Sequence, residues 1–234
     1  MDKWYEMPGK TGTNVIYSRI RLVRNLKEYP FPGRLTKEQS VELSEKLLGG
    51  LTGIASMDRM QYRFTHLERM GDLEKTALLE RRALNRSVMK KKDPTGMILS
   101  EDESTAILLN GDDHVRIQTL QTVSVFVYGE KADRIDDYIG ERFDYAFDEK
   151  YGYLTSFPTN VGTGLRAAVV LHLPMLSKNK NFSSLVADMG RFGTQVRGVY
   201  GEGAENFGSL YQISNQKTLG QTEQEIIDIV RKAA

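Results

Sequence analysis

The chain of 234 residues is long enough for one large domain with a substantial apolar core. Hydrophobic residues make up 40% and charged residues 27%, and the formal net charge is only +1. This balance excludes the strong uniform field typical of proteins that bind nucleic acid or membrane surfaces. The absence of cysteine excludes disulfides, zinc–thiolate sites and a thiol nucleophile. Because neither a signal-peptide core nor an apolar run of roughly 18 residues occurs, we expect a cytoplasmic protein.

No repeat or linker divides the sequence, so we expect one domain over residues 15–234, preceded by a loosely ordered lead-in at 1–14. A capping box of Thr36 and Gln39 begins the first predicted helix. In chain order, the periodicities predict a strand at 15–25, helices at 37–49 and 72–86, strands at 96–100, 104–110 and 114–120, a helix at 131–148, strands at 153–156 and 165–173, a helix at 182–192, strands at 194–200 and 209–214, and a helix at 222–232. Strands in hairpin-like order with helices between groups indicate an α+β fold on a mainly antiparallel sheet flanked by helices.

Arginines recur on one face of four extended segments, because residues two apart in a strand lie on the same side. They are Arg19, Arg21, Arg116, Arg166 and Arg197. An antiparallel sheet covered on one face can leave the other face wet or functional. Guanidinium groups gathered there would repel one another unless a polyanion or carboxylates lay between them, and a triphosphate suits their bidentate geometry. The competing interpretation is that these arginines are scattered surface residues paired with local acids, since alternation does not show that the strands are neighbours.

Three further segments place other chemistry beside these arginines. The stretch NGDDHVRIQ, residues 110–118, sets two aspartates before Arg116, either as a solvated turn or as half of an active site. The segments SFPTNVGTGLR (156–166) and RGVYGEG (197–203) put glycines beside an arginine, where a loop backbone can approach a phosphate closely. Neither segment is a Walker A loop or a G-x-G-x-x-G fingerprint, so the standard nucleotide-binding folds are not supported.

Four motifs in a fixed order resemble the phosphagen (ATP:guanido) kinase family, most closely its bacterial protein-arginine kinase branch. They are SRIRLVRN, NGDDHVRIQ, YGYLTSFPTNVGTGLRAAVVLHLP and VRGVYGEGAENFGSLYQISNQKTLG. The resemblance, from about Val15 to the C-terminus, implies a catalytic domain that transfers the γ-phosphate of MgATP to the guanidinium group of arginine residues in proteins. It implies ATP and Mg²⁺, with the metal carried mainly by the nucleotide, and protein substrates that present arginine. It leaves open the oligomeric state and an activator or adaptor protein. Longer relatives continue into a phosphoarginine-binding domain that we expect to be absent here.

The resemblance also implies roles for individual residues. The ATP-binding residues would be Ser18, Arg19, Ile20, Arg21, Arg82, Arg116, Arg166, Arg197, Gly198 and Gly201. The catalytic carboxylates would be Asp112, as the base that orients the guanidinium group and accepts its proton, and Glu202. The substrate pocket would contain Asp113, Phe157, Thr159 and Asn160.

Three departures from the family pattern keep two alternatives open. Asp112 stands where the Asn-Glu-Glu-Asp-His motif has its catalytic glutamate, Gly111 replaces the preceding acid, and Phe157 replaces a cysteine. These changes would suit a catalytically weakened nucleotide-binding regulatory module. The other alternative is a kinase for a small guanidino compound such as free arginine, although we expect the helical N-terminal domain of such kinases to be absent here, which favours protein arginine.

Overall fold

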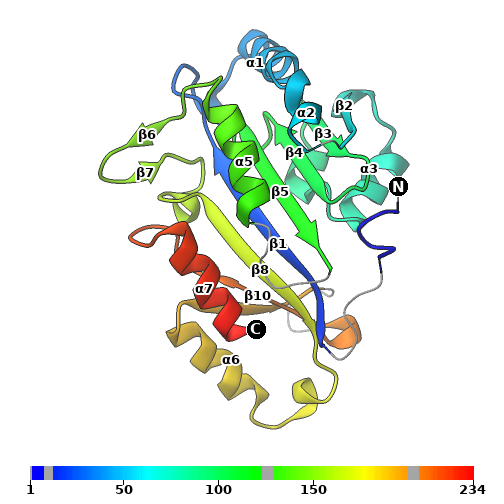
Figure 1. Cartoon of the computed structure of the whole chain (residues 1–234), viewed down its shortest axis with the longest axis vertical. Helices are drawn as coiled ribbons and strands as arrows, with labels where there is room; N and C mark the ends of the chain where they lie inside the picture. Colours follow the sequence, from blue (N-terminus) through cyan, green and yellow to red (C-terminus); the bar gives the residue numbers. More distant parts are fainter. Residues whose placement is uncertain (1, 8–12, 59, 123–128, 200–205) are drawn as a thin grey trace.

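The computed structural model describes residues 2–7, 13–58, 60–122, 129–199 and 206–234 (Figure 1). One eight-stranded sheet runs through the molecule in the order β2-β3-β4-β5-β1-β8-β10-β9, and every neighbouring pair is antiparallel. Helices flank this sheet, which confirms the predicted α+β class. The strands are β1 Val15–Arg24, β2 Tyr62–His66, β3 Gly96–Ser100, β4 Thr105–Leu109, β5 Val115–Gln121, β8 Leu165–His172, β9 Thr194–Gly198 and β10 Leu210–Asn215, with β6 Phe147–Asp148 and β7 Gly152–Tyr153 forming a separate hairpin.

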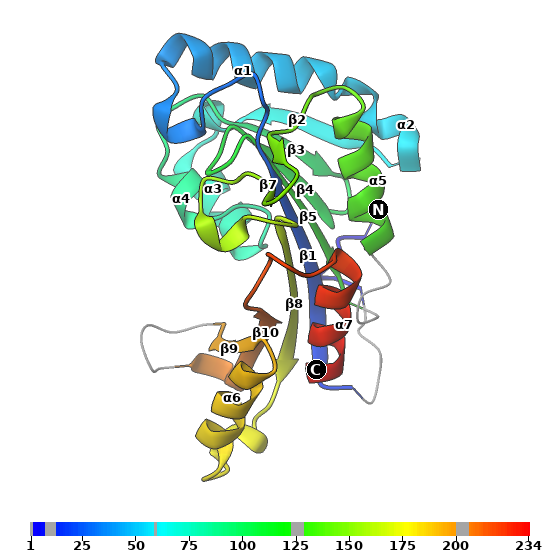
Figure 2. The same cartoon turned by 90° about the vertical axis from the view of Figure 1, so that its left-hand side faces the viewer.

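The helices differ in length and divide between the two faces of the sheet. The α-helices are α1 Lys37–Gly50, α2 Ala55–Asp58, α3 Asp72–Glu80, α4 Arg86–Met89, α5 Gly129–Gly140, α6 Phe182–Arg191 and α7 Glu223–Ala233. Short 3-10 turns lie at Pro32–Arg34, Thr52–Ile54, Leu67–Arg69, Pro158–Asn160, Leu176–Lys178 and Phe207–Ser209. In the turned view of Figure 2, α5 and α7 lie on one side of the strands, and α3 and α4 lie on the other.

The main apolar core fills the space between the sheet and α1, α5 and α7. Alternation along β1 points Ile20 and Leu22 into this core, where they meet Leu47 of α1, Ile139 of α5 and Ile226 of α7. The capping box of Thr36 and Gln39 that begins α1 is present, as the sequence predicted. This face of the sheet is therefore closed by packing, and the residues on alternate positions point to the opposite face.

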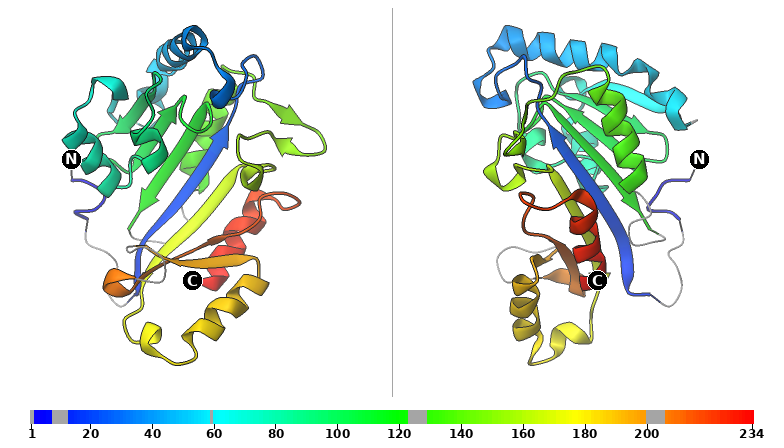
Figure 3. Two further views of the ribbon diagram at one scale, coloured as in Figure 1. Left: turned by 180° about the vertical axis from the view of Figure 1, so that it is seen from behind. Right: turned by 60° about the vertical axis from the view of Figure 1, so that its left-hand side comes forward.

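The opposite face carries two smaller apolar clusters with the central strands between them. Residues of α3 and α4, such as Leu78 and Val88, cover β3 and β4. Near the other end, Trp4 packs against Tyr17 and Val170. Figure 3 (left) shows the face from behind, and none of the described helices crosses β1 and β8 there. The arginine-bearing positions of the central strands lie on this less covered face.

Three predicted elements are wrong at their ends, and two strands, β2 and β6, were not predicted. The helix predicted at 72–86 ends at Glu80, because Arg82 adopts a left-handed φ of 69° and the chain turns Leu84 inward. The helix predicted at 131–148 ends at Gly140, and its later apolar residues belong to a turn and to β6. The strand predicted at 153–156 is the two-residue β7, and the edge strand β2 lacks a clear period of two.

Part of the predicted lead-in 1–14 lies outside the described residues, and among the described ones Trp4 is packed against the sheet. Trp4 is only 7% exposed, its ring lies 5.3 Å from that of Tyr17, and its backbone N–H donates to the Asp102 carbonyl at 2.8 Å. A large aromatic side chain offers enough apolar area to hold a short terminal segment against the sheet. None of the helices that the structure describes combines the length and apolar character that a membrane span requires.

Candidate active site

The stretch NGDDH forms the tip of the β4–β5 hairpin, residues 110–114. Asn110 has a left-handed φ of 54°, which asparagine tolerates better than most residues. Its buried side-chain amide donates to Ser40 Oγ at 2.6 Å and to the Pro94 carbonyl at 2.7 Å. The backbone N–H of Asn110 donates to the His114 carbonyl at 2.7 Å and closes the turn. These hydrogen bonds therefore hold the two aspartates of the tip in a fixed position.

Asp112 is held from one side by two residues that the sequence did not single out. Asn85 Nδ2 and Ser87 Oγ each donate to Asp112 Oδ2 at 2.8 Å. Both donors belong to the start of α4, which packs closely on the tip: a Cβ on Gly111 would lie 2.9 Å from Val88 Cγ2. No described residue hydrogen-bonds Oδ1, so that oxygen is the one available to accept a proton.

Asp113 has a different task, because its carboxylate faces inward. Its Oδ1 accepts hydrogen bonds from Asn25 Nδ2 and from the backbone N–H of Ser156, both at 2.7 Å. Asp113 thereby ties the end of β1 and the loop that carries Phe157 to the hairpin tip. It lines the predicted pocket, but its contacts are those of a residue that positions the loop.

His114 is buried beside the tip as a neutral imidazole. Its Nδ1 accepts from the Leu26 N–H at 2.9 Å, and its Nε2 lies 2.9 Å from the Pro30 carbonyl, which requires the proton on Nε2. Burial lowers the pKa of His114 to about 4. The residue is thus a structural link between the tip and the loop after β1.

The register of the sheet places the predicted arginines on one face. Arg21 of β1 lies directly opposite Arg166 of β8 and Gln118 of β5. Arg19 is two residues away on the same face, and its Nη2 donates to Gln212 Oε1 at 2.9 Å. Gln212 in turn lies opposite Arg197 of β9. The sequence-based prediction that these strands share an arginine face is confirmed.

These arginines are electrostatically unsatisfied. Burial and the neighbouring Arg116, Arg19 and Arg166 hold the pKa of Arg21 well below its usual range. Burial and Arg19 lower the pKa of Arg116 to about 10, although Asp112 and Asp113 oppose the fall. In the described part of the chain none of the five predicted arginines forms an ion pair with a carboxylate within 4.0 Å. Buried Nε atoms without a hydrogen-bond acceptor occur in Arg19, Arg21, Arg116 and Arg166. Such groups favour a bound polyanion, because they remain desolvated and unpaired without one.

A cavity of about 210 Å³ joins the arginines to the carboxylates. It is lined by Arg21, Val23, Asp112, Asp113, Arg116, Phe157, Thr159, Asn160 and Arg166. Arg166 is oriented there by the Asn215 carbonyl, to which its Nη1 donates at 2.8 Å, and by Asn160 Oδ1 at 3.5 Å from Nη2. Phe157 is 52% exposed at its mouth. All four residues predicted for the substrate pocket therefore meet the predicted base and three of the predicted arginines in one place.

The other predicted nucleotide residues are more distant from this cavity. Ser18 and Ile20 point to the opposite side of β1, and Ile20 lies in the main core, so only their backbones could serve a ligand on the arginine face. Arg82 lies near Arg19, since its charge contributes to the lowered pKa of that residue. Arg197 and Gly198 lie exposed at the end of β9. The remaining two, Gly201 and Glu202, lie outside the described residues.

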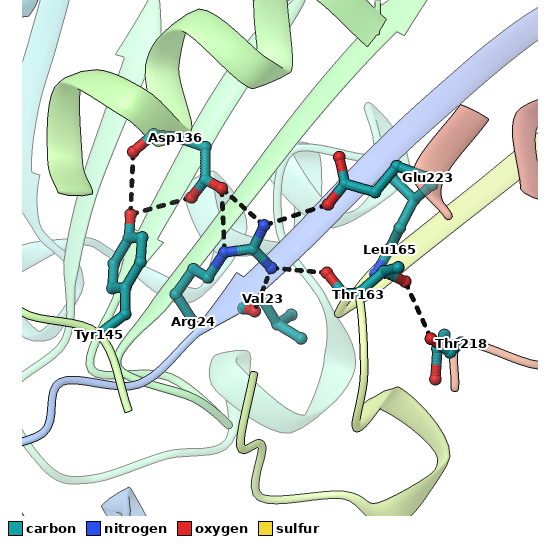
Figure 4. A network of polar contacts seen from close by, with 8 residues as sticks. All are labelled: Val23, Arg24, Asp136, Tyr145, Thr163, Leu165, Thr218 and Glu223. Carbon is teal, nitrogen blue, oxygen red and sulfur yellow. Dashed lines mark hydrogen bonds and ion pairs between the residues drawn. The ribbon is translucent and has the colours of Figure 1, made fainter. Parts of the chain in front are cut away.

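A buried polar network stabilises the end of β1 on the helix side of the sheet (Figure 4). Arg24, 1% exposed, donates from Nε and Nη2 to Asp136 of α5 at 3.0 and 2.6 Å and reaches Glu223 of α7 at 3.4 Å. Its Nη1 donates to the Thr163 carbonyl at 2.7 Å, and Tyr145 donates to Asp136 at 2.9 Å. Asp136 raises the pKa of Arg24 against the effect of burial. The network joins α5, α7 and the loop before β8 on the face of the sheet opposite the arginines.

Comparison with known proteins identifies the family. A model of the ATP:guanido phosphotransferase C-terminal catalytic domain matches residues 45–234. The chain belongs to the ATP:guanido phosphotransferase family. The resemblance carried by the four motifs is thereby confirmed. Within the described residues, no group of three or more acidic or histidine side chains is placed to hold a metal ion.

Two curated relatives are similar over nearly the whole chain. A protein-arginine kinase of Caldanaerobacter subterraneus is 41% identical over 224 residues, which cover 94% of the chain and 66% of the relative. A protein-arginine kinase of Bacillus velezensis is 39% identical over 235 residues, with coverage of 100% and 64%. The chain thus spans about two thirds of the length of these curated relatives.

Two solved structures of guanidino kinases share the fold. Lombricine kinase matches with a TM-score of 0.81 and 26% identity, and the match covers 94% of this chain and 64% of that one. The substrate-free duplicated taurocyamine kinase from Schistosoma mansoni matches with a TM-score of 0.79, 26% identity and coverage of 94% and 32%. These matches place the antiparallel sheet and its helices within the same family fold.

Proposed function

We propose that this domain transfers the γ-phosphate of MgATP to the guanidinium group of arginine residues in proteins. The observation that carries the proposal is the cavity in which Asp112 faces Arg21, Arg116 and Arg166. These are the residue types that the reaction requires, namely cations for a transferring phosphoryl group and a carboxylate for the nucleophile. The protein-arginine kinases that are 41% and 39% identical support the same activity.

The arginine face would bind the nucleotide phosphates. The unpaired Nε atoms and the lowered pKa values of Arg21 and Arg116 fit a polyphosphate, which would replace the missing acceptors. Bound MgATP supplies the phosphoryl group and, through its metal, part of the charge neutralisation. We expect Mg²⁺ to be held mainly by the nucleotide, as in the family.

Asp112 would act on the substrate guanidinium group. A guanidinium has a pKa above 12 and is a poor nucleophile until a carboxylate orients it and removes a proton. Asn85 and Ser87 hold one carboxylate oxygen, so the other oxygen is presented in a fixed direction. Arg116 and Arg166 then stabilise the charge that spreads over the transferring group.

A kinase for a small guanidino compound is the second candidate, because the structural neighbours are named for lombricine and taurocyamine. The higher identity to protein-arginine kinases favours protein arginine. The deciding experiment compares kcat/KM for a single-arginine peptide and for L-arginine, with acid-labile phosphoarginine detected by mass spectrometry. We expect the peptide to be preferred by at least about tenfold. A preference for L-arginine would select the second candidate, and no transfer to either would indicate a regulatory nucleotide-binding module.

From the sequence we predict that the enzyme is cytoplasmic. The need for an activator or adaptor protein can be tested by measuring whether candidate partners raise the rate in the peptide assay.

A further inference from the structure

A groove of about 970 Å³ adjoins the active-site cavity. It shares Asp112 and Phe157 with that cavity, so the two spaces meet at the predicted base. The groove extends between the loop at residues 29–34 and the segment from Ser87 to Asp93. The cavity itself is far smaller and can receive a guanidinium group, whereas the groove has room for several residues of chain.

One wall of the groove is apolar and firmly held. Tyr29 and Phe31 line it together with two prolines. Tyr29 donates to Glu42 at 2.7 Å, and burial together with that carboxylate raises the pKa of Tyr29 to about 12. The loop is also fixed through His114, whose Nε2 bonds the Pro30 carbonyl. Fixed aromatic and proline surfaces suit an extended chain, since little side-chain freedom is lost on binding.

The rim of the groove carries cations that have no partner of their own. Arg34 and Lys90 are exposed, and neither side chain forms an ion pair or hydrogen bond with a described residue. Lys91 differs, because its Nζ donates to the carbonyls of Asn110 and Gly111 at 2.7 and 3.1 Å and supports the tip. Asp93 is the one acid that lines the described groove apart from Asp112.

We propose that this groove binds the extended polypeptide segment on either side of the target arginine, and that Arg34 and Lys90 select segments with acidic residues near it. The proposal rests on the proposed function, because it assumes that the arginine side chain enters the adjoining cavity. An acidic neighbour within two or three residues would lie within roughly 7–11 Å of the arginine, at 3.3–3.6 Å per extended residue. Charge complementarity at such a rim discriminates between partners.

The test uses three peptides with a single arginine, flanked by glutamate, serine or lysine. Both kcat/KM for phosphoryl transfer and direct binding by fluorescence anisotropy are measured for each peptide. With wild-type protein we expect the glutamate-flanked peptide to exceed the lysine-flanked one by at least about fivefold at 50 mM salt. The preference should shrink at 500 mM salt, where the Debye length falls below about 5 Å.

Charge-reversal variants provide the control. The double variant Arg34→Glu/Lys90→Glu should reverse the preference toward lysine flanks. The matched variant Lys92→Glu makes the same change two residues away, outside the groove lining, and should keep the wild-type preference. Equal binding of the three peptides, or an effect of Lys92→Glu as large as that of the double variant, would overturn the proposed role of the groove. If the binding preference depends on Arg34 and Lys90 but no phosphoryl transfer is detected, the groove binds acidic peptides and the proposed kinase function is overturned instead.

Discussion

Replacing Arg116 with methionine is expected to stabilise the nucleotide-free domain while weakening its affinity for MgATP. Burial and the neighbouring Arg19 lower the pKa of Arg116 from 12.5 to about 10. At 1.36 kcal/mol per pKa unit, holding this group charged in the folded state costs about 3 kcal/mol at neutral pH. Because the folded-state pKa is the lower one, the penalty applies at every pH below 10 and is relieved as pH rises from 10 toward 12.5.

Methionine retains an unbranched apolar stem and removes the charge. The change also removes a 3.4 Å hydrogen bond from Arg116 Nη2 to Gln118, which is worth less than about 1 kcal/mol at that length. The net gain is therefore about 2 kcal/mol, or roughly 4–8 °C in Tm for a domain of this size. Loss of a charged contact to phosphate, about 1.5–3 kcal/mol, should weaken nucleotide binding at least about tenfold.

Thermal unfolding with and without a non-hydrolysable MgATP analogue measures both effects. The wild-type domain should gain about 2.7 kcal/mol at 100 times its Kd, and the variant should gain much less at the same concentration. Arg69→Met is the matched control, because Arg69 is exposed and has no side-chain partner among the described residues, so its effect should stay within about 0.5 kcal/mol. If the nucleotide-free Arg116→Met domain melts at or below the wild-type temperature, the arginine cluster is not a source of strain and our reasoning is refuted.

Three further predictions concern the hairpin tip. Asp112→Asn keeps the shape of the side chain, so peptide phosphorylation should fall by about 10²–10⁴ while the Kd for MgATP changes less than about threefold; retained turnover would exclude Asp112 as the base. Ser87→Ala removes one of the two hydrogen bonds to the Asp112 carboxylate and should lower kcat about fivefold with little change in the KM for ATP, and Ser87→Thr should restore the rate if the hydroxyl acts by positioning Asp112. The folded-state pKa of His114, about 4, lies below the unfolded value of 6.5, so the free energy of unfolding should fall by about 3 kcal/mol as the pH drops from 6.5 to 4. Urea titrations of wild type and His114→Gln at several pH values test this. An equal fall in both proteins would contradict the prediction.

The arginine face was predictable because strand periodicity alone decides on which side of a sheet a residue lies. Arg19 and Arg21 differ by two positions, so they share a face whatever their neighbours are. The pairing of Arg21 with Arg166 depends on strand order, which the hairpin-like sequence of elements only suggested. In these antiparallel strands, the face predicted from alternation along each strand is the face on which the sheet register places the arginines.

The residues that hold Asp112 could not be predicted in the same way. Asn85 and Ser87 lie 27 and 25 positions before it; Asn85 falls within the stretch 72–86, whose apolar spacing indicates a continuous helix, and Ser87 directly follows that stretch. The left-handed Arg82 ends that helix early and lets α4 approach the tip. A positive φ at a non-glycine residue leaves no reliable signal in sequence, because it is imposed by the packing of neighbouring residues. The signal that was present is the Asn-x-Ser pair, both of whose side chains are frequent at helix starts.

The close contact between Gly111 and Val88 makes these positions mutationally interdependent. A glutamate at 112 would carry its carboxylate beyond the two donors of α4, and a side chain at 111 would collide with Val88 Cγ2 at 2.9 Å. Introducing the acidic pair of the family motif one residue at a time should therefore impair the domain at each step. Residues in contact commonly show coupling of 0.5–3 kcal/mol, so a smaller residue at 88 should rescue a side chain at 111 that is harmful alone. A side chain at 111 is therefore expected to be accepted only together with a change at 88 in α4.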